Sequence, residues 1–92
     1  MAEVFITFEE LADYLKHGRE IEFRYAGKDY SITNCKYEWQ FCCDTDITTI
    51  KLCSFLEFDI LVEKIRCLDI DGITVEQIFN ERLGDLKILD IL

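Results

Sequence analysis

The amino-acid sequence predicts an α+β domain: a four-stranded antiparallel β-meander packed on one face by two or three helices. Residues 20–43 contain three closely spaced runs in which charged and apolar side chains alternate, the period-two pattern of a half-buried strand. Three motifs of the helix-start type lie on either side of this region. The expected order of elements is helix, four strands, helix and short helix, followed by a segment that can form a final strand.

The composition predicts a single domain over residues 1–92. Half of the residues are hydrophobic, which is enough for a core, and no Pro-rich or low-complexity linker divides the chain. Acidic residues number 19 against 10 basic ones, giving a formal net charge of −9. Such a chain repels nucleic acid and anionic membranes. Two interpretations of the charge stay open: solubility, and attraction to a basic surface on a partner protein.

The first helix is predicted to begin after Thr7. Thr7 and Glu10 have the spacing of a capping box, in which each side chain accepts a hydrogen bond from the other residue's backbone amide. Apolar residues then recur at helical spacing, at Phe8, Leu11, Ala12 and Leu15. The helix is expected to end at His17 and Gly18, with His17 as a cap or surface residue.

The meander is predicted from the runs 20–25, 29–33 and 37–43, with Gly27 in the first turn. Alternation assigns one set of side chains to a buried face: Ile21, Phe23, Tyr25, Tyr30, Ile32, Tyr37, Trp39 and Phe41. The opposite set is expected to face solvent: Glu20, Glu22, Arg24, Ser31, Thr33, Glu38 and Gln40. A fourth strand is expected at 47–53, a stretch rich in β-branched residues.

A second capping box, Ser54 to Glu57, predicts a helix that runs to about Ile65. Its expected core stripe is Phe55, Phe58, Leu61, Val62 and Ile65, widened by Leu56 and Ile60. The dipeptide 71–72 predicts a turn.

A third capping box, at Thr74 and Gln77, predicts a short helix to about Arg82 that is ended by Gly84. The segment 85–91 is the candidate final strand, with Leu86 and Ile88 on one face.

No pattern in the chain indicates an enzyme. A nucleophile needs a base, and the single histidine, His17, is expected on a different element from any cysteine. The four glycines are explained by turns and helix ends, so no phosphate-binding loop is expected. Asp44 and Asp46 flank a threonine, but the rest of a calcium loop is missing. We therefore expect no enzymatic activity, no cofactor and no metal.

The five cysteines predict reduced thiols in a cytoplasmic protein. Their number is odd and no secretion signal is recognisable at the N-terminus. Cys43 and Cys67 are expected to act as small core residues. A zinc site is the alternative, although Cys35, Cys42, Cys43, Cys53 and Cys67 contain no C-x-x-C spacing.

Protein binding is the function that these exclusions leave. If helices cover the aromatic face of the sheet, the other face and its neighbouring loops present carboxylates several ångströms apart, which can imitate a phosphate backbone. The expected partner is a basic protein surface of a nucleic-acid-handling protein. The candidate partner-binding residues are Glu20, Glu22, Glu38, Asp44, Asp46, Asp69 and Asp71.

Several segments carry a resemblance to a known group of proteins. They are TFEEL (7–11), GREIEFRY (18–25), GKDYSI (27–32) and DGITVEQI (71–78). The chain resembles small acidic proteins encoded by phages and mobile elements of Gram-positive bacteria, some of which are anti-CRISPR inhibitors of Cas9. The resemblance implies a bacterial host cytoplasm and occupation of the basic site where a Cas nuclease reads the PAM or holds nucleic acid. The resemblance does not assign a functional role to any residue of this chain.

The alternative function is a phage-type structural or regulatory protein that self-associates through a sheet edge, as a homodimer.

Overall fold

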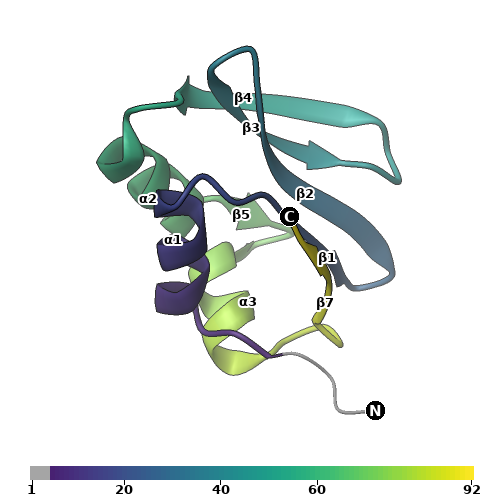
Figure 1. The fold of residues 1–92 in the computed structure, drawn as a ribbon. Coiled ribbons are helices and arrows are strands. Elements are labelled where there is room, and N and C mark those ends of the chain that lie inside the picture. Colours follow the sequence, from purple (N-terminus) through teal and green to yellow (C-terminus); the bar gives the residue numbers. More distant parts are fainter. Residues whose placement is uncertain (1–4) are drawn as a thin grey trace.

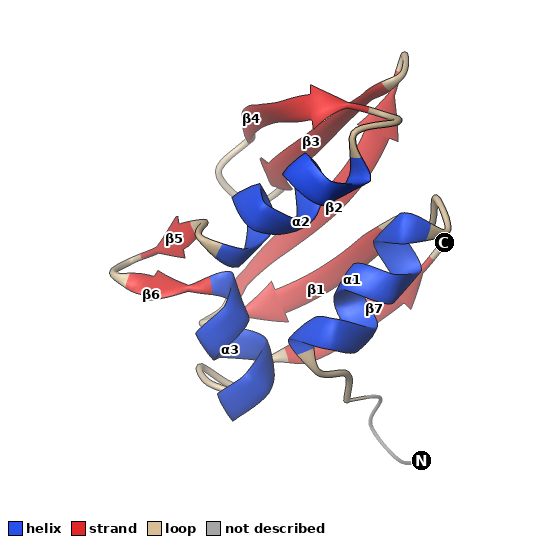
Figure 2. Cartoon of the chain, turned by 90° about the vertical axis from the view of Figure 1, so that its left-hand side faces the viewer, coloured by secondary structure: helices blue, strands red, loops and turns tan. Residues whose placement is uncertain are grey.

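The computed structural model describes residues 5–92 and confirms the predicted α+β class. A five-stranded antiparallel sheet has the strand order β4-β3-β2-β1-β7, and a separate two-stranded hairpin pairs β5 with β6. All three helices lie over the same face of the large sheet (Figures 1 and 2). In chain order, the elements are α1 (Phe8–Lys16), β1 (Ile21–Tyr25), β2 (Lys28–Cys35), β3 (Glu38–Cys43), β4 (Thr48–Ser54), α2 (Phe58–Arg66), β5 (Asp69–Ile70), β6 (Ile73–Thr74), α3 (Val75–Glu81) and β7 (Lys87–Ile91).

The predicted meander is β1 to β4, and the candidate final strand forms as β7. β7 pairs antiparallel with β1, so the C-terminal segment returns to the edge of the sheet where the meander begins. The predicted turn at 71–72 joins β5 to β6, with Asp71 and Gly72 both at positive φ. The sheet therefore has two edge strands, β4 and β7.

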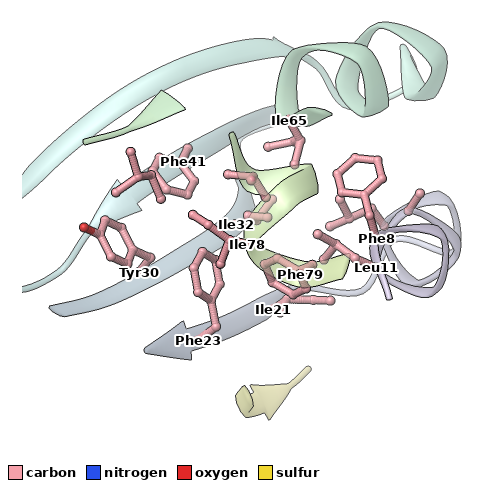
Figure 3. Close-up of a cluster of buried hydrophobic side chains, with 14 of the residues drawn as sticks. Phe8, Leu11, Ile21, Phe23, Tyr30, Ile32, Phe41, Ile65, Ile78 and Phe79 are labelled. Atoms are coloured by element: carbon pink, nitrogen blue, oxygen red, sulfur yellow. The ribbon is translucent and has the colours of Figure 1, made fainter. Parts of the chain in front are cut away.

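The inner face of the sheet is the predicted aromatic face. Phe23 stacks on Tyr30 at 5.5 Å and meets Phe79 of α3 edge-on at 5.1 Å, which fastens the sheet to the helical layer (Figure 3). The fully buried side chains of the sheet are Ile21, Phe23, Ile32 and Trp39. The helices supply their partners from Phe8, Leu11, Leu15, Leu61, Ile65, Val75 and Ile78.

Two residues of the meander differ from their predicted positions or burial. Tyr37 was assigned to the buried face, but it lies in the β2–β3 turn with φ 65° and its side chain is 85% exposed. The alternation stops at Glu38 because the turn takes up Lys36 and Tyr37. Ser31 faces away from the helices, as predicted, but is buried rather than solvated, and its hydroxyl lies 3.4 Å from Asp44 Oδ1.

The predicted capping boxes of α1 and α3 both form. Thr7 Oγ1 accepts a hydrogen bond from the amide of Glu10, and Thr74 Oγ1 accepts one from the amide of Gln77. The end of α3 differs from the prediction: Arg82, in the left-handed conformation, caps the helix two residues before Gly84.

The second predicted capping box does not start a helix. Ser54 is the last residue of β4, and its amide donates to Glu57 Oε1 at 3.1 Å within a turn. The helix α2 begins only at Phe58, because the strand extends to the serine that was expected to be the cap. Leu56, expected on the core stripe, lies in this turn and is 79% exposed, and Ile60 is 44% exposed on the outer side of α2.

The packing around Gly84 gives a prediction for stability. Gly84 has φ +58°, and a Cβ added there would lie 2.6 Å from Cδ1 of the buried Tyr25 ring. We expect Gly84→Ala to lower the free energy of unfolding by about 2–4 kcal/mol, from left-handed strain and overpacking together. Urea denaturation measures the change.

Gly27→Ala is the matched control. Gly27 has φ +80°, but an added Cβ would have no neighbour within 4 Å. We expect a loss of about 1–2 kcal/mol from backbone strain alone. Equal losses in the two variants would show that Tyr25 does not constrain residue 84.

Candidate protein-binding surface

The face of the sheet that lies opposite the helices is open among residues 5–92 (Figure 1). We call this surface the open face. The strand register places its outward side chains in rows: Glu22 lies beside Ser31, which lies beside Cys42, and Thr33 lies beside Gln40. The side chains that define the open face are Glu22, Arg24, Asp29, Ser31, Thr33, Gln40, Cys42, Lys87 and Asp90.

Two carboxylates stand directly opposite each other on the open face. Glu22 on β1 pairs in register with Asp90 on β7. Within the described chain, neither side chain has a hydrogen bond or ion pair. Like charges at directly opposite positions of neighbouring strands repel each other and destabilise a sheet.

The next row of the open face contains an ion pair and a further lysine. Arg24 on β1 lies opposite Asp29 on β2, and its Nε donates to Asp29 Oδ1 at 2.7 Å. This hydrogen bond lowers the pKa of Asp29 and raises the pKa of Arg24. On β7, Lys87 lies directly opposite Arg24 in the strand register. Two cations and one carboxylate therefore lie in the row next to Glu22 and Asp90.

The structure divides the seven predicted partner-binding residues into two groups. Glu20, Glu22, Glu38 and Asp44 lie on the open face or at its margin. Asp46, Asp69 and Asp71 instead line a hollow of about 210 Å³ near the β5–β6 hairpin, together with Lys28, Tyr30, Phe41, Cys43, Thr48, Ile50 and Ile70.

Most of these carboxylates already bind groups of the chain itself. Glu20 Oε2 accepts the amide of Asn34 at 2.8 Å, Glu38 lies 3.9 Å from Lys51 Nζ, and Asp69 Oδ1 accepts the amide of Gly72 at 2.6 Å. Asp44 meets the Ser31 hydroxyl, and Asp46 accepts from Lys28 Nζ at 2.7 Å. In the described residues, only Glu22 and Asp71 of the seven lack a hydrogen bond or ion pair to their side chains.

Sequence reasoning missed Asp90. Its importance depends on the register between β1 and β7, strands separated by most of the chain, and on the bulge between Glu22 and Phe23 that shifts this register. The only signal in the sequence was the candidate strand at 85–91, which does not specify the residue it faces.

The five cysteines differ in burial, and the single histidine lies at a helix end. All five cysteines are free thiols. Cys43 is buried as predicted, but the core role expected for Cys67 is wrong, because this residue follows the end of α2 and is exposed. Burial raises the pKa of the Cys53 thiol. His17 caps α1 and is exposed, as predicted, with Nδ1 2.8 Å from the carbonyl oxygen of Asp13.

Tyr30 lines the hollow near the β5–β6 hairpin, and burial raises the pKa of its hydroxyl group.

Across residues 5–92, no group of three or more His, Cys, Asp or Glu side chains has a geometry that could hold a metal ion. None of the helices in this part of the chain has the length and apolar character needed to cross a membrane.

Comparison of the chain with protein-family models, curated proteins and solved structures finds no match. Functional inference therefore depends on the surface itself.

The pKa of Asp46 depends on its contact with Lys28 and can be tested by substitution. The hydrogen bond from Lys28 lowers the pKa of Asp46, so the unfolded chain takes up this proton at a higher pH than the folded chain. The contribution of the pair to stability is therefore present above the ordinary carboxyl pKa of about 3.9 and is lost as the pH falls through the lower folded value. We expect Lys28→Met to raise the pKa of Asp46, measured by NMR titration of its carboxyl carbon.

Asp29 is the internal control in the same titration. Its pKa is lowered by Arg24, which the Lys28 substitution leaves in place. An unchanged pKa at Asp46, or an equal rise at Asp29, would contradict the assignment of the Lys28–Asp46 contact.

Proposed function

We propose that the chain is a non-enzymatic protein-binding module that docks its open face on a basic surface of a partner protein. One observation carries the proposal: Glu22 and Asp90 oppose each other across neighbouring strands, and neither side chain forms an ion pair among the described residues. Their repulsion costs stability in the free protein. A lysine or arginine from a partner would remove that cost on binding. The pair would therefore be more favourable in the complex than in the free protein.

The total charge supports the same proposal. A net charge of −9 steers a basic surface toward the chain and raises the association rate at low ionic strength. Glu20 lies two residues before Glu22 in the sequence. Asp44 contacts the hydroxyl of Ser31, the residue that lies opposite Glu22 in the strand register. Both retain negative charge while bound by neutral donors, and this extends the acidic area around the central pair.

The sharpest form of the proposal is an inhibitor of the anti-CRISPR type. Its partner would be a Cas9-type nuclease, whose PAM-reading and nucleic-acid-holding surface is built from arginine and lysine. The resemblance to small acidic phage proteins and the net charge favour this form. Because Glu38 and Asp46 are engaged by lysines of the chain, the contact is centred on Glu22 and Asp90 rather than spread over all seven predicted residues.

The test is a binding measurement between the purified chain and a panel of Cas9-type nucleases, by calorimetry at about 50 mM and about 500 mM salt, where screening differs strongly. The expected result is binding that weakens with salt, together with inhibition of DNA cleavage. Binding without salt dependence would reject the open face as the contact. No binding to any nuclease would reject the inhibitor form, and capture of a different basic protein from host extract would then identify the partner class.

Neutralisation of the central pair gives a prediction for the same assay. We expect Glu22→Gln with Asp90→Asn to weaken binding at least tenfold, because close charge pairs across a protein interface contribute about 1.5 kcal/mol or more each. The same variant should be as stable as the parent in urea or more stable, since the repulsion between β1 and β7 is removed. Loss of binding without loss of stability separates a contact role from a folding role.

Asp59→Asn with Glu81→Gln is the matched control. Both residues are exposed on the helices, α2 and α3, and the substitutions change the net charge by the same amount. This variant should retain most of the affinity. Equal weakening in the two double variants would mean that only the total charge matters.

A second candidate function is a structural or regulatory protein that self-associates through a sheet edge. The exposure of strand β4 favours it. This function uses a different surface, so partner binding through Glu22 and Asp90 and self-association through β4 can be measured independently.

A further inference from the structure

The two edges of the five-stranded sheet are protected unequally. On β7, the guanidinium of Arg19 donates to the carbonyl oxygen of Ile91 at 3.3 Å, and the strand carries the charged side chains of Lys87 and Asp90. Charged side chains and covered carbonyls are the usual devices that stop an edge strand from pairing with another chain. The β7 edge is therefore blocked.

The β4 edge is protected only at its C-terminal end. Lys64 of α2 donates to the carbonyl oxygen of Leu52, and a bulge opposite Trp39 and Gln40 interrupts the ladder at the same place. From Thr48 to Lys51 every residue is exposed, and Ile50 is 50% exposed. This stretch is β-branched except for its lysine and contains no proline, so it retains the capacity to pair with a further strand.

The β4 strand is also free of acidic residues. In a chain with 19 acids, β4 carries a single charged side chain, that of Lys51. Two copies with a net charge of −9 repel each other over most of their surfaces. An antiparallel contact between two β4 strands places no acid of one strand opposite an acid of the other, in any register.

Charged side chains lie beside both ends of β4 on the helix side. Asp69 and Asp71 share the hollow near the hairpin with Thr48 and Ile50, toward the beginning of the strand. Lys64 lies against Leu52, toward its end. Asp59 and Glu63 lie beside Lys64, so this end of the strand is not positively charged overall. A two-fold axis normal to the sheet reverses the strand direction and keeps both helical layers on one side, so the hairpin of each copy approaches Lys64 of the other.

We propose that β4 is a self-association edge: two copies pair their β4 strands antiparallel and join their sheets into one continuous sheet. Backbone hydrogen bonds at Thr48–Lys51 supply the pairing, and cross-strand threonine and isoleucine contacts support it. A two-fold axis normal to the sheet gives this antiparallel direction. The pairing makes the second candidate function specific, and it leaves the open face of both copies free for a basic partner.

The test uses a matched pair of substitutions on the two edge strands. We expect sedimentation velocity to show a monomer–dimer equilibrium for the parent between about 10 µM and about 1 mM, because so small an interface is weak. Ile50→Glu places two carboxylates near the two-fold axis and should weaken the dimer at least tenfold. Leu89→Glu introduces the same group on β7, where Leu89 is 37% exposed, and should leave the equilibrium unchanged.

Amide hydrogen exchange adds a readout that does not depend on a variant. In the parent, the amides of 48–51 should become more protected as the concentration rises, while those of β7 should not change. A parent that stays monomeric throughout this range, a dimer that is lost in Leu89→Glu but kept in Ile50→Glu, or protection confined to β7 would each overturn the proposal. Circular dichroism checks that both variants are folded.

These measurements are independent of the proposed binding of a basic partner. The Glu22 and Asp90 substitutions test the open face and leave β4 intact, whereas Ile50→Glu acts only on β4. A loss of dimer with retained partner binding, or the reverse, identifies which of the two ideas has failed.

Discussion

The structure depends on burying the aromatic face of the sheet. Phe23 occupies the centre of this face, with Tyr30 and Phe41 beside it in the sheet and Phe79 of α3 against its ring edge-on. Each aromatic side chain buries a large area, so this cluster supplies much of the hydrophobic free energy available to a small domain. Because three short helices are needed to cover that face, none is left in the described chain for the opposite face, and a solvent-facing sheet surface follows from the way the core is built.

The three helices are held to one another by one side chain as well as by the sheet. Arg66, near the C-terminal end of α2, pairs with Glu76 of α3, and its guanidinium lies 4.9 Å from the ring centroid of Phe8 on α1. The amide of Phe8 in turn donates to Asn80 Oδ1 of α3 at 2.9 Å. Contacts of this kind fix the spacing of short helices that have little stability alone. The helical layer is therefore a joined unit that positions the strands beneath it.

Local chemistry explains which parts of the fold could be predicted from the sequence. Alternation identified the buried face of β1 to β3 because each strand is half covered, and the threonine caps at Thr7 and Thr74 identified two helix starts. The start of α2 was misplaced because Ser54 suits a strand end and a helix cap equally well, and the pairing of β4 with β3 decided between them. A short-range pattern cannot contain that long-range information.

The same limit explains the candidate site. The sequence placed Glu22 on the solvent-facing side of a strand, but its place in the proposed site depends on Asp90, which the long-range pairing of β1 with β7 brings opposite it. Some other carboxylates of the sheet have a cation of the chain as partner: Asp29 has Arg24 and Asp46 has Lys28. A protein that provides cations for these acids, yet sets two carboxylates face to face across β1 and β7, retains a repulsion that its own fold does not need. A repulsion of this kind makes the isolated protein slightly less stable and would make a complex with a positively charged surface correspondingly more favourable, which is the thermodynamic argument for the proposed binding role of the open face.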